Sequence, residues 1–380
     1  MINVFQPSLG EQEVEAVREV FKSNWLTKGK KVEEFERKFA EYQGVAPNQM
    51  VSTTCATEGL FSIFEIIGLT HGDEVIMPTI GFVATASAVC NVGAKPVFCD
   101  VDLHTLNMTM ESIGVVFTSK TKAVLVNHYG GYPAEMEKIA NFCNSKGIYL
   151  IEDAACAIGT SINSKKVGTF GDFAVWSFDS MKILVSGGDG GMIYCRDVEK
   201  AKYMREHLYL GLMEGGKSGL EKSKGTKDRW WEYEISQYGR RAIMNDVTAS
   251  IGLVQLSKLA QFLKRRDDVA KKYFELLDGV KGITLPPKPS NGEVVTYYLY
   301  WIQLEKRDEL ARYLLDNNIY TTFRYWPLHK VSMFHHDPHT KLSNSELVTN
   351  ITLNLPCHHS LSDNDVEYIV SKIKDFVKNN

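Results

Sequence analysis

The sequence lacks the patterns that are typical of membrane proteins, nucleic-acid-binding proteins and disulfide-stabilised secreted domains. Its seven cysteines are an odd number and form no C-x-x-C pair, so we expect neither a disulfide framework nor a zinc site. The first residues, MINVFQPSLG, lack the basic and apolar regions of a signal peptide, and no run approaches the roughly 18 apolar residues that span a bilayer. The net charge is −3, with lysines and arginines spread along the chain. These absences predict a cytoplasmic protein that binds neither nucleic acid nor membrane.

What the sequence does contain is typical of an α/β enzyme. Its 380 residues are 44% hydrophobic and 23% charged, enough for a sizeable core. From about residue 50 to 200, short apolar runs alternate with helical segments, which favours a mainly parallel sheet covered by helices on both faces. The expected strands are 74–78, 95–101, 122–128, 148–153, 173–178 and 191–195. We predict a large α/β domain over residues 1–247, beginning with a helical segment.

The pattern changes after about residue 247. Helical periodicity over 248–278 is followed by a strand at 296–304 and a helix at 307–318, which predicts a smaller α+β domain over residues 248–380. Residues 213–229 are rich in glycine and lysine and are predicted to form a surface loop.

Four features of the first domain could carry chemistry. The polar turn 53–60 leads into a helix, whose N-terminus suits a phosphate, although an ordinary helix cap gives the same pattern. Asp153 ends an apolar strand, where open α/β sheets bind ligands, and could hold a pyridine nitrogen or cap the next helix. Lys182 precedes a glycine cluster and could form a Schiff base, with Ser177 on the phosphate, although a lone lysine is usually a surface residue. Phe82 could stack on a flat ring or belong to the core. Together the four indicate a site for pyridoxal 5′-phosphate (PLP).

Eight segments, three of which contain residues of this site, are spread over nearly the whole chain. They are WLTKGKKVEEFE (25–36), GDEVIMPTIGFVATASAV (72–89), VGAKPVFCDVD (92–102), IEDAACAIG (151–159), VGTFGDFAVWSFDSMK (167–182), GDGG (188–191), ASIGLVQL (249–256) and LNLPCHHSLSD (353–363). Together they resemble the DegT/DnrJ/EryC1/StrS family of PLP-dependent sugar aminotransferases, which have the fold-type I architecture. The resemblance implies a large domain with a mostly parallel seven-stranded sheet between helices, and a homodimer with shared active sites.

The resemblance also implies a role for particular residues. Lys182 corresponds to the Schiff-base lysine that moves protons, and Asp153 to the partner of the pyridinium nitrogen. Phe82 corresponds to the stacking aromatic. The implied phosphate contacts are Ala56, Thr57 and Ser177, and the implied substrate residues are Thr27, Asp179, Tyr325 and His329. Because a proton-shuttling lysine must be partly deprotonated, we expect burial to lower the pKa of Lys182.

The reaction implied by the resemblance is an amino transfer from L-glutamate to a nucleotide-linked keto-sugar. A 4-keto-6-deoxyhexose is the favoured acceptor, and the product would be an amino-deoxy sugar for a polysaccharide, O-antigen, lipopolysaccharide or other glycan. A 3-keto-sugar aminotransferase and a PLP-dependent sugar dehydratase of the same family are alternatives. Such dehydratases carry histidine in place of the lysine, so Lys182 argues against the second.

The chain departs from the family pattern at three places. Cys156 stands where glutamine or histidine is common, so the contact that this position makes with the cofactor ring or its 3-hydroxyl stays open. Asp179 stands where histidine is common. Within YGRRAIMNDV (238–247), where relatives carry an asparagine that reaches the partner's cofactor phosphate, this chain offers Arg240 and Arg241. Alternate residues of an extended segment point in opposite directions, and we favour Arg241 as the phosphate contact.

Two further motifs are interpreted as coincidences. GLMEGGKS (211–218) fits the phosphate-loop pattern G-x-x-x-x-G-K-S of a nucleotide-binding protein, but it lacks an apolar strand before it and a helix after it. The histidines of HHDPH (335–339) and CHH (357–359) are interpreted as loop residues, and we expect no metal site.

Overall fold

The computed structural model describes residues 1–213, 229–334, 337 and 339–379, and a seven-stranded sheet lies at its centre. The strand order is β1-β9-β8-β5-β4-β2-β3, in which β9 runs antiparallel to both of its neighbours and the other neighbouring pairs are parallel. The strands are β1 (Met50–Thr53), β2 (Glu74–Pro78), β3 (Lys95–Cys99), β4 (Thr121–Asn127), β5 (Tyr149–Asp153), β8 (Phe173–Ser177) and β9 (Gly191–Cys195). The predicted mostly parallel seven-stranded sheet is confirmed.

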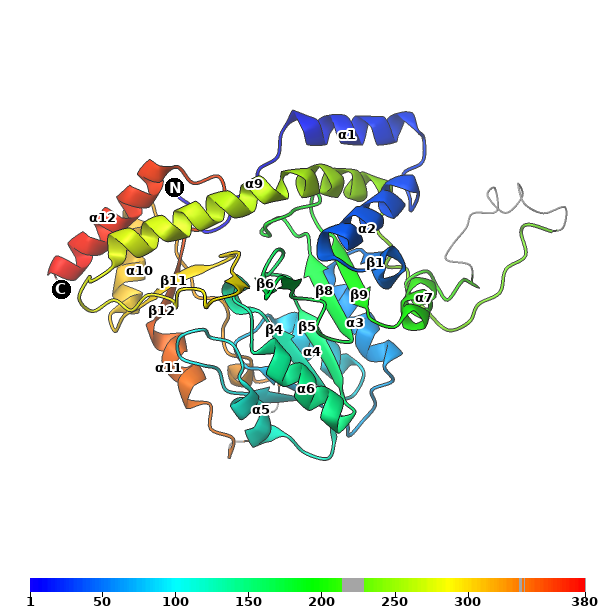
Figure 1. Cartoon of the computed structure of the whole chain (residues 1–380), viewed down its shortest axis with the longest axis horizontal. Coiled ribbons are helices and arrows are strands. Elements are labelled where there is room, and N and C mark those ends of the chain that lie inside the picture. Colours follow the sequence, from blue (N-terminus) through cyan, green and yellow to red (C-terminus); the bar gives the residue numbers. More distant parts are fainter. Residues whose placement is uncertain (214–228, 335–336, 338, 380) are drawn as a thin grey trace.

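Helices cover both faces of this sheet (Figure 1). Val75 and Met77 of β2 belong to one apolar cluster with the first group of helices, while Ile76 between them belongs to a cluster with the second group. The first group is α3 (Ala56–Ile66), α4 (Val83–Asn91) and α7 (Val198–His207), and the second is α5 (Met110–Val116) and α6 (Met136–Lys146). Because successive side chains of a strand point to opposite faces, a near-continuous apolar run is buried on both sides.

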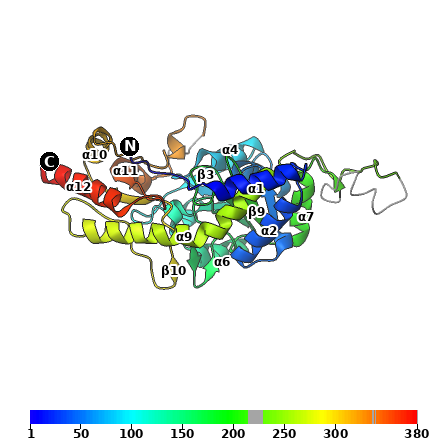
Figure 2. The ribbon, with the colours of Figure 1, turned by 90° about the horizontal axis from the view of Figure 1, so that it is seen from above.

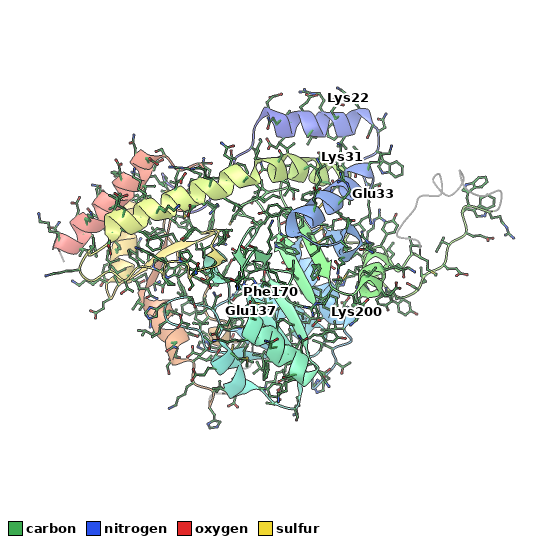
Figure 3. All side chains as sticks on the ribbon, in the orientation of Figure 1. Lys22, Lys31, Glu33, Glu137, Phe170 and Lys200 are labelled. Carbon is green, nitrogen blue, oxygen red and sulfur yellow. The ribbon has the colours of Figure 1, made fainter. Side chains whose placement is uncertain are left out.

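The 32-residue helix α9 (Asp246–Leu277) connects the sheet region to the C-terminal part of the chain. Helices α1 (Glu11–Lys22) and α2 (Lys30–Gln43) pack on its first half, and α12 (Asp363–Asn379) packs near its other end (Figures 1 and 2). Lys22, in the last turn of α1, lies on the outer surface of the molecule (Figure 3). The expected boundary between residues 247 and 248 falls in the first turn of α9, and the division into two domains stays a prediction.

The C-terminal part is mixed α and β. Strand β11 (Tyr300–Gln303) pairs with β12 (Thr352–Leu355), and α10 (Arg307–Asp316) and α11 (Ser343–Ile351) lie between them in the sequence. Strand β10 (Glu293–Val294) joins two short strands that come earlier in the chain, β6 (Ser161–Ile162) and β7 (Lys165–Lys166), in a three-stranded sheet. Short 3₁₀ turns occupy Pro47–Gln49, Tyr129–Gly131 and Leu328–Lys330.

Several elements differ from the sequence prediction, among them the short strands β6, β7, β10 and β12, which were not predicted. Strand β1 was not predicted, because its four residues MVST carry too weak an apolar pattern. Strand β3 ends two residues early, at Cys99, and β11 is four residues long because Tyr297, with a φ of 46°, interrupts the extended backbone before it. Most of the predicted loop at 213–229 lies outside the described residues. Among the described helices, none is both long enough and apolar enough to cross a membrane.

Candidate active site

A cavity of about 540 Å³ opens at the carboxyl edge of the parallel strands. Asn127 ends β4, Asp153 ends β5 and Ser177 ends β8, and all three side chains line this cavity. Because the carboxyl ends of parallel strands meet at one edge of a sheet, residues far apart in the sequence converge there. The cavity wall includes Ala56, Thr57, Phe82, Asp153, Cys156, Ser177 and Lys182, which are seven of the eight predicted cofactor residues.

One end of the cavity is formed by the N-terminus of α3. Cys55 caps this helix, and its Sγ accepts a hydrogen bond from the Glu58 N–H at 3.4 Å. The first N–H groups of a helix have no partner within it and carry the positive end of its dipole. Gly191 of β9 passes so closely that a Cβ on it would lie 2.6 Å from the Ala56 nitrogen. Glycine at this position therefore lets β9 approach the first turn of α3, and the predicted phosphate contact at Ala56 and Thr57 stays a prediction.

The two acidic residues that end β5 point to different environments. Glu152 is fully buried, lies 3.2 Å from His128 Nε2, and accepts hydrogen bonds from the Gly168, Phe170 and Gly171 N–H groups at 2.6–2.7 Å. Glu152 therefore holds the loop before β8, while Asp153 faces the cavity. The sequence identified the acidic pair but could not separate a structural member from a ligand-facing one.

Asp153 lies at the floor of the cavity. Its Oδ1 accepts a hydrogen bond from the Ala155 N–H at 3.0 Å. Burial raises the pKa of Asp153, and the nearby Lys182, the Ala155 N–H and His128 offset this only in part. A carboxylate in such a place gains most from a partner with a positive charge, such as a protonated ring nitrogen.

The amine of Lys182 lies among groups that are weak acids. Its Nζ donates to Cys156 Sγ at 3.4 Å and lies 4.8 Å from the ring centroid of Tyr298. Burial lowers the pKa of Lys182, but Cys156, Tyr298, Tyr325 and Asp153 together raise it well above its usual value. The expected net lowering of this pKa is therefore wrong, because burial is outweighed by the acidic groups that face the amine.

Two aromatic residues line the same cavity. The Phe82 ring lies 5.7 Å from the Tyr325 ring, at 54°, and both line the cavity. The Tyr325 hydroxyl lies 3.9 Å from Cys156 Sγ. Phe82 is 49% exposed, so it is a cavity-wall residue that can cover a flat ligand and not a core phenylalanine.

The four predicted substrate residues divide into two pairs. Asp179 and Tyr325 line the cavity, whereas Thr27 and His329 are not among its wall residues. The Thr27 carbonyl accepts a hydrogen bond from the Asp246 N–H at 3.1 Å, and its side chain is exposed. His329 Nδ1 lies 2.7 Å from Thr79 Oγ1, which fixes the segment after Tyr325 to the end of β2.

The two arginines of the segment 238–247 point in different directions. Arg240 is held by Glu58 and Glu65 of α3, with its Nη1 at 2.9 Å from Glu58 Oε1 and its Nε at 3.0 Å from Glu65 Oε2. Arg241 is exposed, and its guanidinium lies 5.2 Å from the ring centroid of Tyr209. Arg241 is the one predicted cofactor residue that does not line its own chain's cavity, while Arg240 is occupied within its own chain.

The residues of this cavity fit PLP. They provide an amine for a Schiff base, a carboxylate for a ring nitrogen, free N–H groups for a phosphate and an aromatic wall. The sequence did not single out Asn127, Tyr298 or Arg324. A signal existed for Asn127, because it ends a predicted strand just as Asp153 does, whereas Tyr298 and Arg324 come from irregular segments.

Neither a phosphate loop nor a metal site gains support from the described part of the chain. Most of the phosphate-loop pattern at 211–218 lies outside the described residues, as do His335, His336 and Pro338. His359 stacks on Phe262 with ring centroids 4.0 Å apart. Within residues 1–213, 229–334, 337 and 339–379, no three His, Cys, Asp or Glu side chains are grouped as metal ligands.

Comparisons with known proteins agree with this geometry. The DegT/DnrJ/EryC1/StrS aminotransferase family matches residues 7–374. The chain is 46% identical over 380 residues to a dTDP-4-dehydro-2,3,6-trideoxy-D-glucose 4-aminotransferase of Saccharopolyspora spinosa, covering 100% of this chain and 97% of the relative. It is 33% identical to a GDP-perosamine synthase of Escherichia coli O157:H7, covering 99% and 98%.

A solved structure is similar over the same length. The crystal structure of the aminotransferase TlmJ from Streptoalloteichus hindustanus has 46% identity and a TM-score of 0.94, covering 100% of this chain and 99% of that one. The chain therefore belongs to the DegT/DnrJ/EryC1/StrS aminotransferase family and is a pyridoxal 5′-phosphate-dependent sugar aminotransferase.

Proposed function

We propose that the enzyme transfers the amino group of L-glutamate to carbon 4 of a nucleotide-linked 4-keto-6-deoxyhexose. The observation that carries this proposal is the 46% identity, along the whole chain, to an aminotransferase named for dTDP-4-dehydro-2,3,6-trideoxy-D-glucose. That name describes a nucleotide-linked hexose with a carbonyl at carbon 4 and no hydroxyl at carbon 6. The use of the product in a polysaccharide, O-antigen or other glycan stays a prediction.

Lys182 and Asp153 are the proposed catalytic residues. Bound PLP supplies an aldehyde for a Schiff base and a ring that accepts electrons. Lys182 lines the cavity, with its Nζ 3.4 Å from Cys156 Sγ, and is placed to carry a proton to and from the reacting carbon. Asp153, whose pKa is raised by burial, is placed to share a proton with the ring nitrogen and so to keep the ring positively charged.

The remaining residues are proposed to bind and orient. The Ala56 and Thr57 N–H groups and the Ser177 hydroxyl would hold the phosphate, and Phe82 would cover the ring. Cys156 Sγ is near enough to Lys182 Nζ, at 3.4 Å, to orient the amine.

A partner subunit would complete the site. Arg241 of one protomer would reach the cofactor phosphate of the other in a homodimer, since its guanidinium is exposed and is not among its own cavity's wall residues. Thr27 and His329 lie outside the cavity wall and would act on substrate only from its edge.

Mass spectrometry of the reaction products tests this function. The purified holoenzyme is mixed with L-glutamate and dTDP-, GDP- or UDP-linked 4-keto-6-deoxyhexoses, and with the matching 3-keto isomers in separate reactions. We expect exchange of the carbonyl oxygen at carbon 4 for an amine, together with formation of 2-oxoglutarate. Amination of 3-keto sugars alone, or loss of water without amination, would contradict the proposal.

A further inference from the structure

The amine of Lys182 contacts a sulfur atom and the face of an aromatic ring. Its Nζ donates to Cys156 Sγ at 3.4 Å and lies 4.8 Å from the ring centroid of Tyr298. Both contacts favour the ammonium form of the amine, because a sulfur lone pair accepts an N–H bond and the face of an aromatic ring attracts a cation. A neutral amine gains less from either contact.

Tyr298 is fixed beside this amine by its own packing. It is fully buried, and its ring stacks on Phe5 with centroids 5.2 Å apart and an interplanar angle of 25°. The N–H of the next residue, Leu299, donates to the Gly130 carbonyl at 3.1 Å. Within the described residues the Tyr298 hydroxyl has no hydrogen-bond partner, so the ring and not the hydroxyl meets the amine.

The sulfur of Cys156 is held in the turn that follows β5. The Ala157 N–H donates to the Ala154 carbonyl at 3.0 Å across this turn, and the Tyr325 hydroxyl lies 3.9 Å from Cys156 Sγ. Cys156 lines the cavity together with Lys182. The sheet and the C-terminal part of the chain therefore each supply one of the two groups that contact the amine.

Asp153 contributes less to the charge on this amine than the sulfur and the ring do. Burial lowers the pKa of Lys182, whereas Cys156, Tyr298, Tyr325 and Asp153, in that order, raise it to well above its usual value. Asp153 is also the proposed partner of the ring nitrogen, so its charge is engaged when the cofactor is bound. In the working enzyme the amine then depends on Cys156 and Tyr298.

We propose that Cys156 and Tyr298 form a seat for the ammonium form of Lys182, in which the sulfur accepts an N–H bond and the ring faces the charge. This inference rests on the proposed role of Lys182 as the proton carrier. When Lys182 takes the proton from the donor's α-carbon, the electron pair of the broken C–H bond passes to the cofactor ring and the amine becomes an ammonium. The seat stabilises this ammonium, so Cys156 and Tyr298 are positioning residues that make Lys182 a stronger base.

The seat has opposite effects on two reactions of the same amine. As a base, Lys182 gains from a stable ammonium. As a nucleophile towards the aldehyde of the cofactor, Lys182 must be neutral, and the seat lowers the neutral fraction. Removing the seat should therefore slow the first reaction and accelerate the second. A general loss of packing around Lys182 would slow both.

Capture of the cofactor is the first measurement. Cofactor-free enzyme is mixed with saturating PLP at pH 8, and the absorbance change follows bond formation with Lys182. In Cys156→Ala the rate constant should rise about 10-fold, which is the change in neutral amine for one pKa unit. Cys156→Ser keeps an acceptor for the N–H bond and should stay within about 3-fold of wild type. Cys90→Ala, a change at an exposed cysteine of α4, is the matched control.

The half-reaction of the holoenzyme with L-glutamate is the second measurement. At saturating L-glutamate its rate constant should fall roughly 3–10-fold in Cys156→Ala, because a weaker base removes the proton more slowly. The isotope effect with α-deuterated L-glutamate should rise with this loss, since proton removal then limits the rate more fully. Cys156→Ser should again resemble wild type.

Two substitutions of Tyr298 separate its ring from its hydroxyl. Tyr298→Phe keeps the ring face and should resemble wild type in both measurements. Tyr298→Leu removes the ring and should change both rates in the same directions as Cys156→Ala. The absorbance of bound cofactor shows that each variant has folded, and the Cys156 variants decide the outcome if Tyr298→Leu binds none.

Several outcomes would overturn the inference. Slower capture together with a slower half-reaction in Cys156→Ala would reduce Cys156 to a packing residue, and two unchanged rates would show that the amine does not depend on the sulfur. Equal changes in Tyr298→Phe and Tyr298→Leu would assign the contact to the hydroxyl. A wild-type enzyme that captures PLP but takes no amino group from L-glutamate would contradict the proposed function instead, and the capture rates distinguish that result from these.

Discussion

The cavity has two walls that are built differently. The wall from the sheet takes Asn127, Asp153 and Ser177 from the ends of three strands, so their backbones are fixed by ladder hydrogen bonds. The wall from the C-terminal third takes Arg324 and Tyr325 from an irregular segment, and ring contacts to Phe5 and Phe82 hold them. The comparison suggests a division of work, in which the sheet wall performs the chemistry and the C-terminal wall selects the substrate.

If that division holds, the largest loss of turnover comes from the sheet side of the cavity, where Lys182 lies in the loop between β8 and β9. Lys182→Ala removes the proposed proton carrier and should lower turnover by at least about 10³-fold. Product formation over many turnovers measures this, with Lys202→Ala on the exposed side of α7 as the control. Retained multiple turnover would show that another group carries the proton.

Asp153→Asn should have the next largest effect. An amide cannot stabilise a protonated ring nitrogen as a carboxylate does, so kcat should fall about 100-fold, equivalent to roughly 2.7 kcal/mol in the activation barrier. The Kd for cofactor should rise as well, which equilibrium dialysis measures.

Its neighbour Glu152 provides a contrast on the same strand. Glu152→Gln should cost stability, by roughly 2–3 kcal/mol, because a buried carboxylate accepts three backbone N–H groups there. Folded Glu152→Gln should keep most of its kcat. Near-normal kcat in Asp153→Asn would instead indicate that a different acid faces the ring.

A smaller loss, of cofactor affinity, is expected from a change at Arg241, the residue that the partner subunit would contribute. Arg241→Ala should weaken cofactor binding about 10-fold through the lost phosphate contact. At a cofactor concentration too low to load Arg241→Ala homodimers, hybrid dimers of Lys182→Ala and Arg241→Ala subunits should regain activity, since one of their two sites combines an intact Lys182 with an intact Arg241. Size-exclusion chromatography with tagged subunits shows that the hybrids form. Absence of rescue in such hybrids would place Arg241 in its own subunit or in no site.

Arg240→Ala is the control for this experiment. Arg240 is held by Glu58 and Glu65, so its loss should reduce stability and should show no rescue between subunits.

The two walls also differ in how far the sequence predicts them. Asp153 and Lys182 follow apolar strands, so a periodicity of buried residues places them at the sheet edge without any knowledge of distant contacts. Arg324 is brought to the cavity by contacts with Phe5 and Met181, which are 319 and 143 positions away in the sequence. Such contacts depend on tertiary packing, so local pattern does not reveal them. The net pKa shift of Lys182 was missed for the same reason, because Cys156, Tyr298 and Tyr325 reach its amine only in the fold.

The smallest expected effect lies in the C-terminal part and concerns stability. Burial lowers the pKa of His358 to about 4 and that of His359 to about 3, and the nearby Arg266 lowers both further. An unfolded histidine has a pKa near 6.5, so between that value and the folded pKa the unfolded chain binds more protons. Stability is therefore complete above about pH 6.5 and falls as the pH is lowered towards 4 and then 3.

His359→Phe tests this dependence directly. A phenyl ring can keep the stacking on Phe262 but cannot take up a proton. The free energy of unfolding should therefore fall by about 1–2 kcal/mol less in His359→Phe than in wild type between pH 7 and pH 5. Urea unfolding midpoints at the two pH values measure the effect, with His104→Asn, a change at an exposed position, as the control. Because His359 is not among the residues that line the cavity, kcat at pH 7 should not change. An acid sensitivity equal to that of wild type would show that His359 is protonated within the folded protein and that this part of the interior tolerates charge.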